Sequence, residues 1–123
     1  MISTFKLPLS ASSSTLQSFK YTMSGRGANP QRQNAPHPHY VMADPSDEFL
    51  VVPDLGADLL RLYAIDKTSG KLTDCPAQAT SPGTGPRHVT FWTPPAASKV
   101  GRRASVAGTM MYSANELSNS VSA

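Results

Sequence analysis

The sequence of 123 residues lacks several features that define common classes of protein. It contains one cysteine, Cys75, which cannot form an internal disulfide and is compatible with the reducing environment of the cytoplasm. No apolar run reaches about 18 residues, so we expect no membrane span. No basic segment followed by an apolar core stands at the N-terminus, so we expect no secretory signal. Together these absences predict a cytoplasmic location.

Charge is also scarce. Charged residues make up 15% of the chain, and 11 basic against 8 acidic side chains leave a net charge of +3. This charge is too small and too scattered to indicate a nucleic-acid partner, although it would not repel an anionic substrate. Eleven prolines and eight glycines argue against long helices and favour many turns.

What the sequence does contain is an internal repeat. The segments His39–Pro45 and His88–Pro94 each begin with His, continue with a mostly apolar stretch and end with Pro. They are separated by roughly 50 residues, a period that in strand-like sequence is typical of propeller blades. Further along, Asp54–Leu59 aligns with Glu116–Val121 at a longer spacing than the two histidines, so the second copy carries an insertion.

Alternating apolar residues predict the strands. We expect two strands over 2–9 and 16–23, then strands at 40–43, 49–52 and 60–65, and a short outer strand beginning at 71–73. The run Phe49–Val52 is apolar on both faces and is therefore expected to be covered on both. Four antiparallel strands in about 50 residues is the blade pattern.

The sequence therefore predicts an all-β fold, a partial β-propeller with one complete four-stranded antiparallel blade and two incomplete blades. We assign residues 1–23 to the end of a preceding blade and 24–38 to a linker. Residues 39–80 form the complete blade, and 81–123 form the next, incomplete blade with an inserted loop at about 95–109. Because blades bury their faces against their neighbours, we expect this chain to be a piece of a longer propeller.

Blade topology predicts which polar side chains meet. The loop that enters the first strand and the turn between the second and third strands lie at the same end of a blade. His39, Arg87 and His88 stand at starts of first strands, whereas Asp54 and Glu116 stand in second-to-third turns. All five are expected at one mouth of the central channel, where they would form an acid–base and anion-binding site.

Several of these residues also have a purely structural interpretation. A His at a strand start often only hydrogen-bonds a neighbouring loop, and Arg87 could bridge carboxylates between blades. Asp54 flanks Gly56, so turn chemistry alone explains it. Glu116 is harder to explain in this way, because it follows apolar residues at a position that faces the predicted channel mouth.

Four motifs in order carry a resemblance to a known family. They are the segments 35–39 (Ala-Pro-His-Pro-His), 52–58 (Val-Pro-Asp-Leu-Gly-Ala-Asp), 83–88 (Gly-Thr-Gly-Pro-Arg-His) and 115–117 (Asn-Glu-Leu). This pattern resembles the lactonase family of seven-bladed β-propellers, which includes bacterial 6-phosphogluconolactonases and the fungal carboxy-muconate lactonizing enzyme. The resemblance covers about residues 30 to 121.

The resemblance implies a cofactor-free site with His39, Arg87 and Glu116 as catalytic residues. Arg87, together with His88, His37 and Asp54, would contact a small anionic lactone or muconate. Either Glu116 or His39 would activate water, and Arg87 would bind the substrate anion or stabilise the oxyanion. A further Arg is expected from a later blade, so we expect the truncated chain to be inactive by itself. The oligomeric state is not predicted.

Hydrolysis of a sugar-acid lactone is the leading interpretation, with cycloisomerisation of a muconate as an alternative. A non-catalytic scaffold propeller is a second class, which an assay of lactone opening would separate from an enzyme. A metal site at His37, His39 and His88 is disfavoured, because Pro38 stiffens the loop and the family needs no metal. The run Arg102–Ser105 resembles a kinase site, but such short matches arise by chance.

Overall fold

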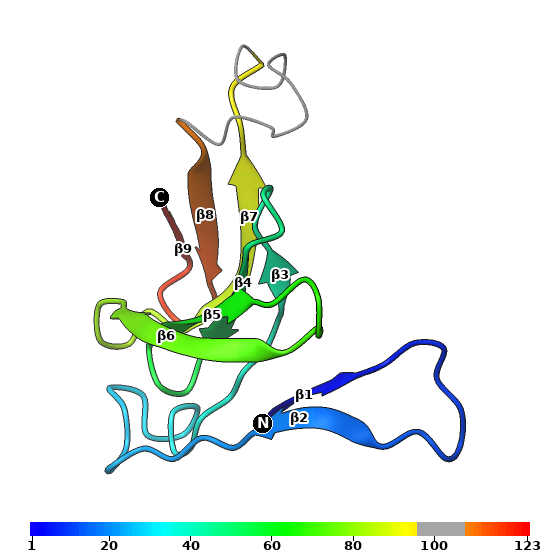
Figure 1. Ribbon diagram of the computed structural model, residues 1–123. Helices are drawn as coiled ribbons and strands as arrows, with labels where there is room; N and C mark the ends of the chain where they lie inside the picture. Colours follow the sequence, from blue (N-terminus) through cyan, green and yellow to red (C-terminus); the bar gives the residue numbers. More distant parts are fainter. Residues whose placement is uncertain (96–107) are drawn as a thin grey trace.

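A computed structural model describes residues 1–95 and 108–123 of the chain. The described residues form β-strands joined by turns and loops, as the abundance of proline and glycine predicts (Figure 1). The all-β class is confirmed. The strands, in chain order, are β1 (Ile2–Phe5), β2 (Thr15–Phe19), β3 (Met42–Ala43), β4 (Phe49–Asp54), β5 (Leu59–Ile65), β6 (Leu72–Ala79), β7 (Pro86–Trp92), β8 (Met110–Asn115) and β9 (Ser120–Ser122).

The strands form three antiparallel sheets that follow one another in chain order (Figure 1). The first sheet is the hairpin β1–β2, the second is the four-stranded meander β3–β4–β5–β6, and the third is β7–β8–β9. One complete blade therefore lies between two incomplete ones, and the predicted partial propeller is confirmed. Strands β3 and β7 are the first strands of their sheets.

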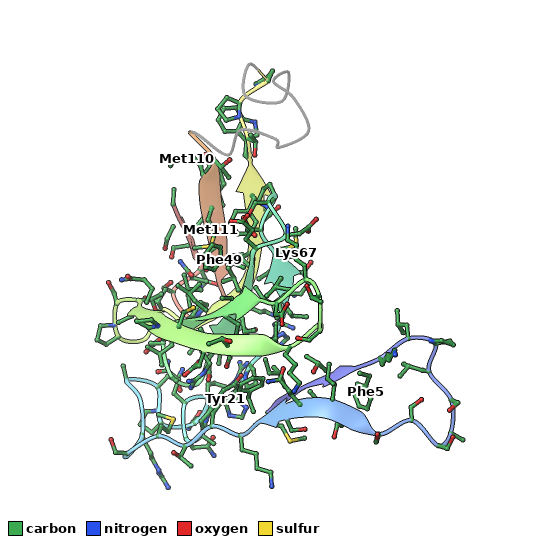
Figure 2. The ribbon with its side chains drawn as sticks, viewed as in Figure 1. Phe5, Tyr21, Phe49, Lys67, Met110 and Met111 are labelled. Atoms are coloured by element: carbon green, nitrogen blue, oxygen red, sulfur yellow. The ribbon has the colours of Figure 1, made fainter. Side chains whose placement is uncertain are left out.

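The middle blade is packed on both faces. On one face Val51 and Leu60 pack with Val89 of β7, and partly buried Met111 of β8 joins this cluster. On the other face Val52, Tyr63 and Leu72 form a second cluster, against which Ile2, Phe19 and Tyr21 of the N-terminal segment pack. Figure 2 shows Tyr21 on this side, between the first sheet and the middle blade. Because successive side chains of a strand point to opposite faces, the apolar run of β4 supplies both clusters.

Several strand bounds differ from the predicted ones. The two N-terminal strands end at Phe5 and Phe19, earlier than Leu9 and Met23, although Tyr21 still packs against the blade. The first strand of the middle blade shrinks to Met42–Ala43. The outer strand β6 spans eight residues, so the expectation of a short fourth strand was wrong. The sequence of β6 does not alternate between apolar and polar residues, because most of its side chains are exposed on both faces of the strand.

The repeat also aligns one residue away from the predicted frame. Pro38 pairs with Asp54 in the first copy, and Pro86 pairs with Asn115 in the second. His39 therefore matches Arg87 rather than His88. The match between the two first strands and the match between the two second strands each shift by one residue. The predicted insertion between β7 and β8 therefore keeps its length.

The turns between second and third strands explain the shift. Asp58 and Asn119 occupy the same place in these turns, with φ of 52° and 49°. Asp and Asn tolerate this left-handed conformation better than most residues. The backbone geometry of these turns therefore determines which residues of the two repeats correspond. The predicted frame instead matched His with His and Asp54 with Glu116. In the structure Asp54 corresponds to Asn115.

The segment 24–38, which the sequence assigned to a linker, is docked against the middle blade. Gln33 is fully buried, and its side-chain Nε2 donates to the carbonyl of Leu55, while its Oε1 accepts from the backbone of Asn29. Gly56 lies so close to the segment that a Cβ at this position would collide with the carbonyl oxygen of Ala35. The segment thus has a fixed place beside the β4–β5 turn.

Two predicted features lie outside the described residues. The basic run Arg102–Ser105 and most of the inserted loop at 95–109 fall within 96–107. In the part of the chain that is described, no helix is long and apolar enough to cross a membrane.

Candidate functional site

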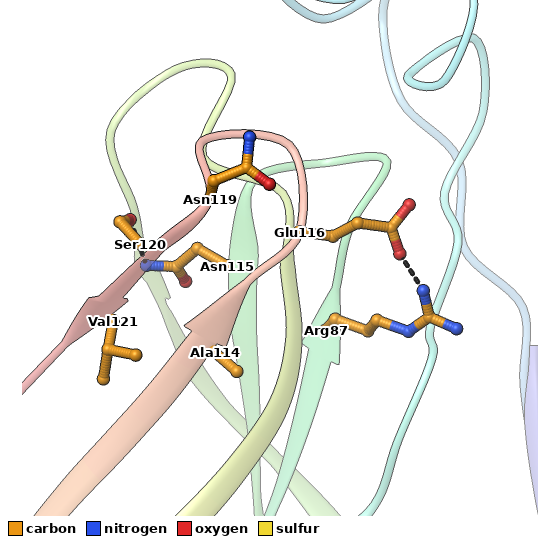
Figure 3. Close-up of a pocket in the computed structure, with 7 residues that line it drawn as sticks. All are labelled: Arg87, Ala114, Asn115, Glu116, Asn119, Ser120 and Val121. Atoms are coloured by element: carbon orange, nitrogen blue, oxygen red, sulfur yellow. Dashed lines mark hydrogen bonds and ion pairs between the residues drawn. The ribbon is translucent and has the colours of Figure 1, made fainter.

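The carboxylate of Glu116 binds two guanidinium groups from distant parts of the chain. Its Oε2 accepts a hydrogen bond from Nη1 of Arg87, and its Oε1 accepts one from Nη2 of Arg32. Both contacts are ion pairs. Figure 3 shows the Arg87 side chain reaching toward Glu116 from the neighbouring strand. The predicted site contained Arg87 and Glu116 but not Arg32.

The two arginines keep Glu116 ionised. The hydrogen bond from Arg32 lowers the pKa of the Glu116 carboxyl below its ordinary value of 4.5, and the hydrogen bond and charge of Arg87 add to this effect. At neutral pH the group is therefore a paired carboxylate. Such a carboxylate is a poor proton acceptor, because protonation would break both ion pairs.

Backbone contacts fix the position of Glu116 relative to Arg87. The N–H of Glu116 donates to the carbonyl of Gly85 at 2.9 Å, which ties the β8–β9 turn to the segment that enters β7. Gly85 has φ of 60°, and a Cβ there would lie 2.5 Å from Cγ of Leu117. A glycine is therefore required at this position on both conformational and steric grounds.

The middle blade also binds the segment that enters β7. The buried carboxylate of Asp58 accepts hydrogen bonds of 2.7 Å from the backbone N–H groups of Gly83 and Gly85. The carbonyl of Asp58 also accepts from the N–H and hydroxyl of Thr80. The path of the chain into Arg87 is thus set by the β4–β5 turn of the preceding blade.

His39, which precedes β3, contacts His88 of β7. Their ring centroids lie 5.7 Å apart in an edge-to-face arrangement, and Tyr40 makes a similar contact with His88 at 5.0 Å. The backbone of His39 is fixed by a hydrogen bond from its N–H to the carbonyl of Pro53. Both imidazoles are exposed, so they are accessible to a ligand.

His37 lies on the same side as His39. Together with Gln31, Arg32, Asn34 and Leu55 the two histidines line a pocket of about 370 Å³. Nε2 of His37 is 3.3 Å from Oδ1 of Asn34, and the backbone N–H of His37 donates to Oδ1 of Asp54. Arg32 thus borders this pocket and also binds Glu116.

A second pocket, of about 390 Å³, is lined by Glu116 (Figure 3). Arg87 and Glu116 form its charged wall, and Asn115, Asn119 and Val121 contribute to the rest. The Nε atom of Arg87 is buried and has no hydrogen-bond partner among the described residues. The pair Arg32–Glu116 therefore links the two pockets.

Asp54 does not face either pocket. Its side chain has no exposed surface, and its Oδ2 accepts hydrogen bonds from Nε and Nη2 of Arg61 at 2.8 and 2.7 Å. Its Oδ1 accepts from the backbone of His37 and Ala57. We therefore propose a structural role for Asp54, in place of the predicted contact with substrate. It orients the segment that carries His37 and His39.

Arg32 is the residue at this site that sequence reasoning missed. It stands in a polar segment without periodicity, so no strand pattern places it. The one signal for it in the sequence is Asn29, a residue type that often begins turns. In the structure the N–H groups of Arg32 and Gln33 both donate to the Asn29 carbonyl. An Asn that starts such a turn predicts order in the linker.

The donor set does not suggest a metal centre. Within residues 1–95 and 108–123, no group of three or more His, Cys, Asp or Glu side chains is arranged to hold a metal ion. The chemistry at hand consists of imidazole, guanidinium and carboxylate, which suits proton transfer and the binding of anions.

Sequence comparisons identify the family of the chain. It matches the family described as "Lactonase, 7-bladed beta-propeller" over residues 1–123. A protein of Arthroderma benhamiae named as a probable 6-phosphogluconolactonase is 40% identical over 108 residues, which are 88% of this chain and 25% of that protein. The 6-phosphogluconolactonase of Bacillus subtilis is 39% identical over 67 residues, or 54% of this chain and 18% of that protein.

Solved structures are similar to this chain in fold. A protein of Bacteroides fragilis assigned as a 6-phosphogluconolactonase superposes with a TM-score of 0.63 and 29% identity, covering 80% of this chain and 26% of that one. A protein of Lactobacillus plantarum superposes with a TM-score of 0.66 and 27% identity, covering 95% and 29%. The chain spans about a quarter of the length of the Arthroderma benhamiae relative. It belongs to the lactonase family of seven-bladed β-propellers.

Proposed function

We propose that the site around Arg87 and Glu116 opens the lactone ring of a sugar acid by hydrolysis. The observation that carries this proposal is the carboxylate of Glu116 bound by two guanidinium groups, one of which, Arg32, lines a pocket with the exposed imidazoles of His37 and His39. The names of the relatives support the choice of reaction, since the Bacillus subtilis relative is named 6-phosphogluconolactonase and the Arthroderma benhamiae relative is named a probable one.

His39 is the proposed base. Sequence reasoning left the base open between Glu116 and His39, but Glu116 is paired with both arginines and its pKa is lowered. His39 is exposed and lies on the pocket bordered by Arg32. An imidazole accepts a proton near neutral pH, whereas a doubly paired carboxylate does not.

The reaction then follows in two steps. His39 takes a proton from water as its oxygen attacks the lactone carbonyl, and the carbonyl oxygen becomes an oxyanion. Arg87 stabilises this oxyanion with its charge and its donor groups. The tetrahedral intermediate collapses, the bond from the carbonyl carbon to the ring oxygen breaks, and the imidazolium of His39 protonates the departing alkoxide. The product is the open hydroxy acid.

A chimeric enzyme tests this proposal. The matching 108 residues of the Arthroderma benhamiae relative are replaced by the corresponding residues of this chain, because the relative supplies the rest of a propeller. We expect the chimera to accelerate hydrolysis of 6-phosphogluconolactone over buffer. Arg87→Ala should lower kcat by about 100-fold, which is typical for loss of an oxyanion donor.

Lys71→Ala is the control, since Lys71 is exposed on the loop before β6, and it should leave kcat unchanged. A folded chimera that does not accelerate hydrolysis would refute the proposal and favour a scaffold role. Full activity in Arg87→Ala would remove the role assigned to Arg87.

A further inference from the structure

We propose that Arg32 binds the anionic end of the substrate and makes the site selective for phosphorylated or carboxylated lactones. This inference rests on the proposed function and adds a specificity residue to it. None of the four motifs that mark the family contains Arg32, which comes from the segment that precedes the first of them.

The backbone around Arg32 is held in place. The N–H of Arg32 donates to the carbonyl of Asn29 at 3.0 Å and lies 3.3 Å from its Oδ1. The next residue, Gln33, is fully buried and bonds to Leu55 of the β4–β5 turn. Gly27 closes the loop by donating its N–H to the carbonyl of Gln33. Arg32 is therefore presented from an anchored loop, which reduces the entropy lost when a ligand binds.

The local charge favours an anion. One carboxylate, Glu116, is shared by two guanidinium groups, so the cluster retains one net positive charge. The side chain of Arg32 is 51% exposed, and only Nη2 is engaged with Glu116. A guanidinium carries five N–H donors in a planar fork, so several donors of Arg32 remain free for phosphate or carboxylate oxygens.

The pocket that Arg32 lines can accommodate the anionic end of a substrate. Arg32, Asn34, His37 and His39 line the same pocket, and Arg87 lines a different one. A substrate that binds in this pocket beside His39 would find the guanidinium of Arg32 in the same pocket wall for its anionic end. Arg87 then serves the reacting carbonyl, and Arg32 serves the terminal anion.

The test measures binding to the 123-residue chain, without any turnover. The probes are 6-phosphogluconate and gluconate, which share an open sugar acid and differ by one phosphate. Their dissociation constants are measured by following the histidine ring signals in NMR titrations. We expect the chain to bind the phosphorylated probe about tenfold more tightly than gluconate, as a charge-assisted contact to phosphate implies.

Arg32→Gln should reduce this ratio to about one, and Arg32→Lys should retain part of it, because an ammonium keeps the charge but loses the fork. Arg26→Gln is the matched control: Arg26 is exposed in the same segment, and its loss removes the same charge. The ratio in this variant should equal that of the wild-type chain. Dispersed amide signals in each variant establish that the fold is intact, and if Arg32→Gln loses them, Arg32→Lys decides the outcome.

The proposal is overturned if the wild-type chain does not prefer the phosphorylated probe, if Arg32→Gln keeps the preference, or if Arg26→Gln loses it to the same extent. The result is separable from the lactonase proposal. A preference that depends on Arg32, with an inactive chimera, supports this inference and refutes hydrolysis. An active chimera without the preference does the reverse.

Discussion

The carboxylate of Asp58 accepts a hydrogen bond of 2.7 Å from the backbone N–H of Gly85, two residues before Arg87. It accepts a second bond of the same length from the N–H of Gly83. Through this one side chain, the β4–β5 turn of the middle blade determines how the next blade begins. The position of the guanidinium at the site therefore depends on contacts made by the preceding blade.

Replacement of Asp58 should destabilise the fold. Asp58→Ala leaves two backbone donors without their acceptor and puts Ala at a φ of 52°. We expect a loss of about 3 kcal/mol in the free energy of unfolding, measured by urea denaturation, from the lost charge-assisted bonds and the strain.

Asp47→Ala separates these two causes. Asp47 has φ of 57° but is exposed in the β3–β4 turn, so its replacement reports the strain alone, about 1 kcal/mol. Equal losses in the two variants would show that the bonds to Gly83 and Gly85 contribute nothing to stability.

Replacement of Gln33 should lower the free energy of unfolding far more than replacement of Gln31 in the same loop. Gln33→Ala removes a fully buried amide and leaves the carbonyl of Leu55 and the N–H of Asn29 unpaired. Each buried group left unpaired costs about 1 to 3 kcal/mol, so we expect a total loss of about 3 kcal/mol. Gln31→Ala, at an exposed position, should change stability by less than about 0.5 kcal/mol. Similar values for the two variants, again by urea denaturation, would contradict the docked position of the segment.

The N-terminal hairpin should be coupled to the middle blade through two tyrosines. The hydroxyl groups of Tyr21 and Tyr63 are 2.6 Å apart, and the guanidinium of Arg61 lies 3.9 Å from the centroid of the Tyr21 ring. A double-mutant cycle of Tyr21→Phe and Tyr63→Phe should give a coupling energy of about 1 kcal/mol. The exposed Tyr40, replaced by Phe in a cycle with Tyr63→Phe, should give additive losses. A coupling of zero between Tyr21 and Tyr63 would mean that the hairpin does not pack as described.

Acid should weaken the β3–β4 turn. Burial pushes the pKa of Asp44 up, but hydrogen bonds from Ser46, Phe49 and Glu48 outweigh it and bring the pKa below the ordinary 3.8. A carboxyl whose pKa is lowered by folding stabilises the folded state above its unfolded-state pKa, and this contribution is lost as the pH falls through the folded-state pKa. The free energy of unfolding should therefore decrease below pH ~4.

Asp44→Asn should flatten this part of the pH profile, because Asn cannot be protonated in that range. Asp47→Asn removes a neighbouring exposed carboxyl from the same turn and serves as the comparison. If both variants keep the slope of the wild-type chain, Asp44 does not contribute to acid sensitivity.

Strand pattern and turn chemistry predicted the architecture well. The apolar run Phe49–Val52 predicted burial on both faces. The structure places Val51 and Val52 in different clusters but leaves Phe49 exposed. The outer strand β6 was underestimated because its exposed side chains carry no apolar period. The repeat frame was off by one residue because chemical similarity between His39 and His88 outweighed the backbone constraint at Asp58 and Asn119, which only φ angles reveal.

The site was predicted in part. The repeat and the blade topology placed His39, Arg87, His88, Asp54 and Glu116 at one end of the blades, and the family resemblance singled out His39, Arg87 and Glu116 as catalytic. Arg32 was missed because its position depends on Gln33 and Asn29, whose contacts follow no period. Asp54 was assigned to the substrate because a sequence does not show that Arg61, seven residues later, reaches back to its carboxylate.

The most direct test of this account is the titration of the Glu116 side chain by carbon NMR in the 123-residue chain. We predict a pKa below the ordinary 4.5, because Arg32 and Arg87 both bind the carboxylate. Arg32→Gln and Arg87→Ala should each raise this pKa toward the ordinary value. A pKa at or above 4.5 that neither replacement changes would contradict the shared carboxylate on which the site and its proposed chemistry depend.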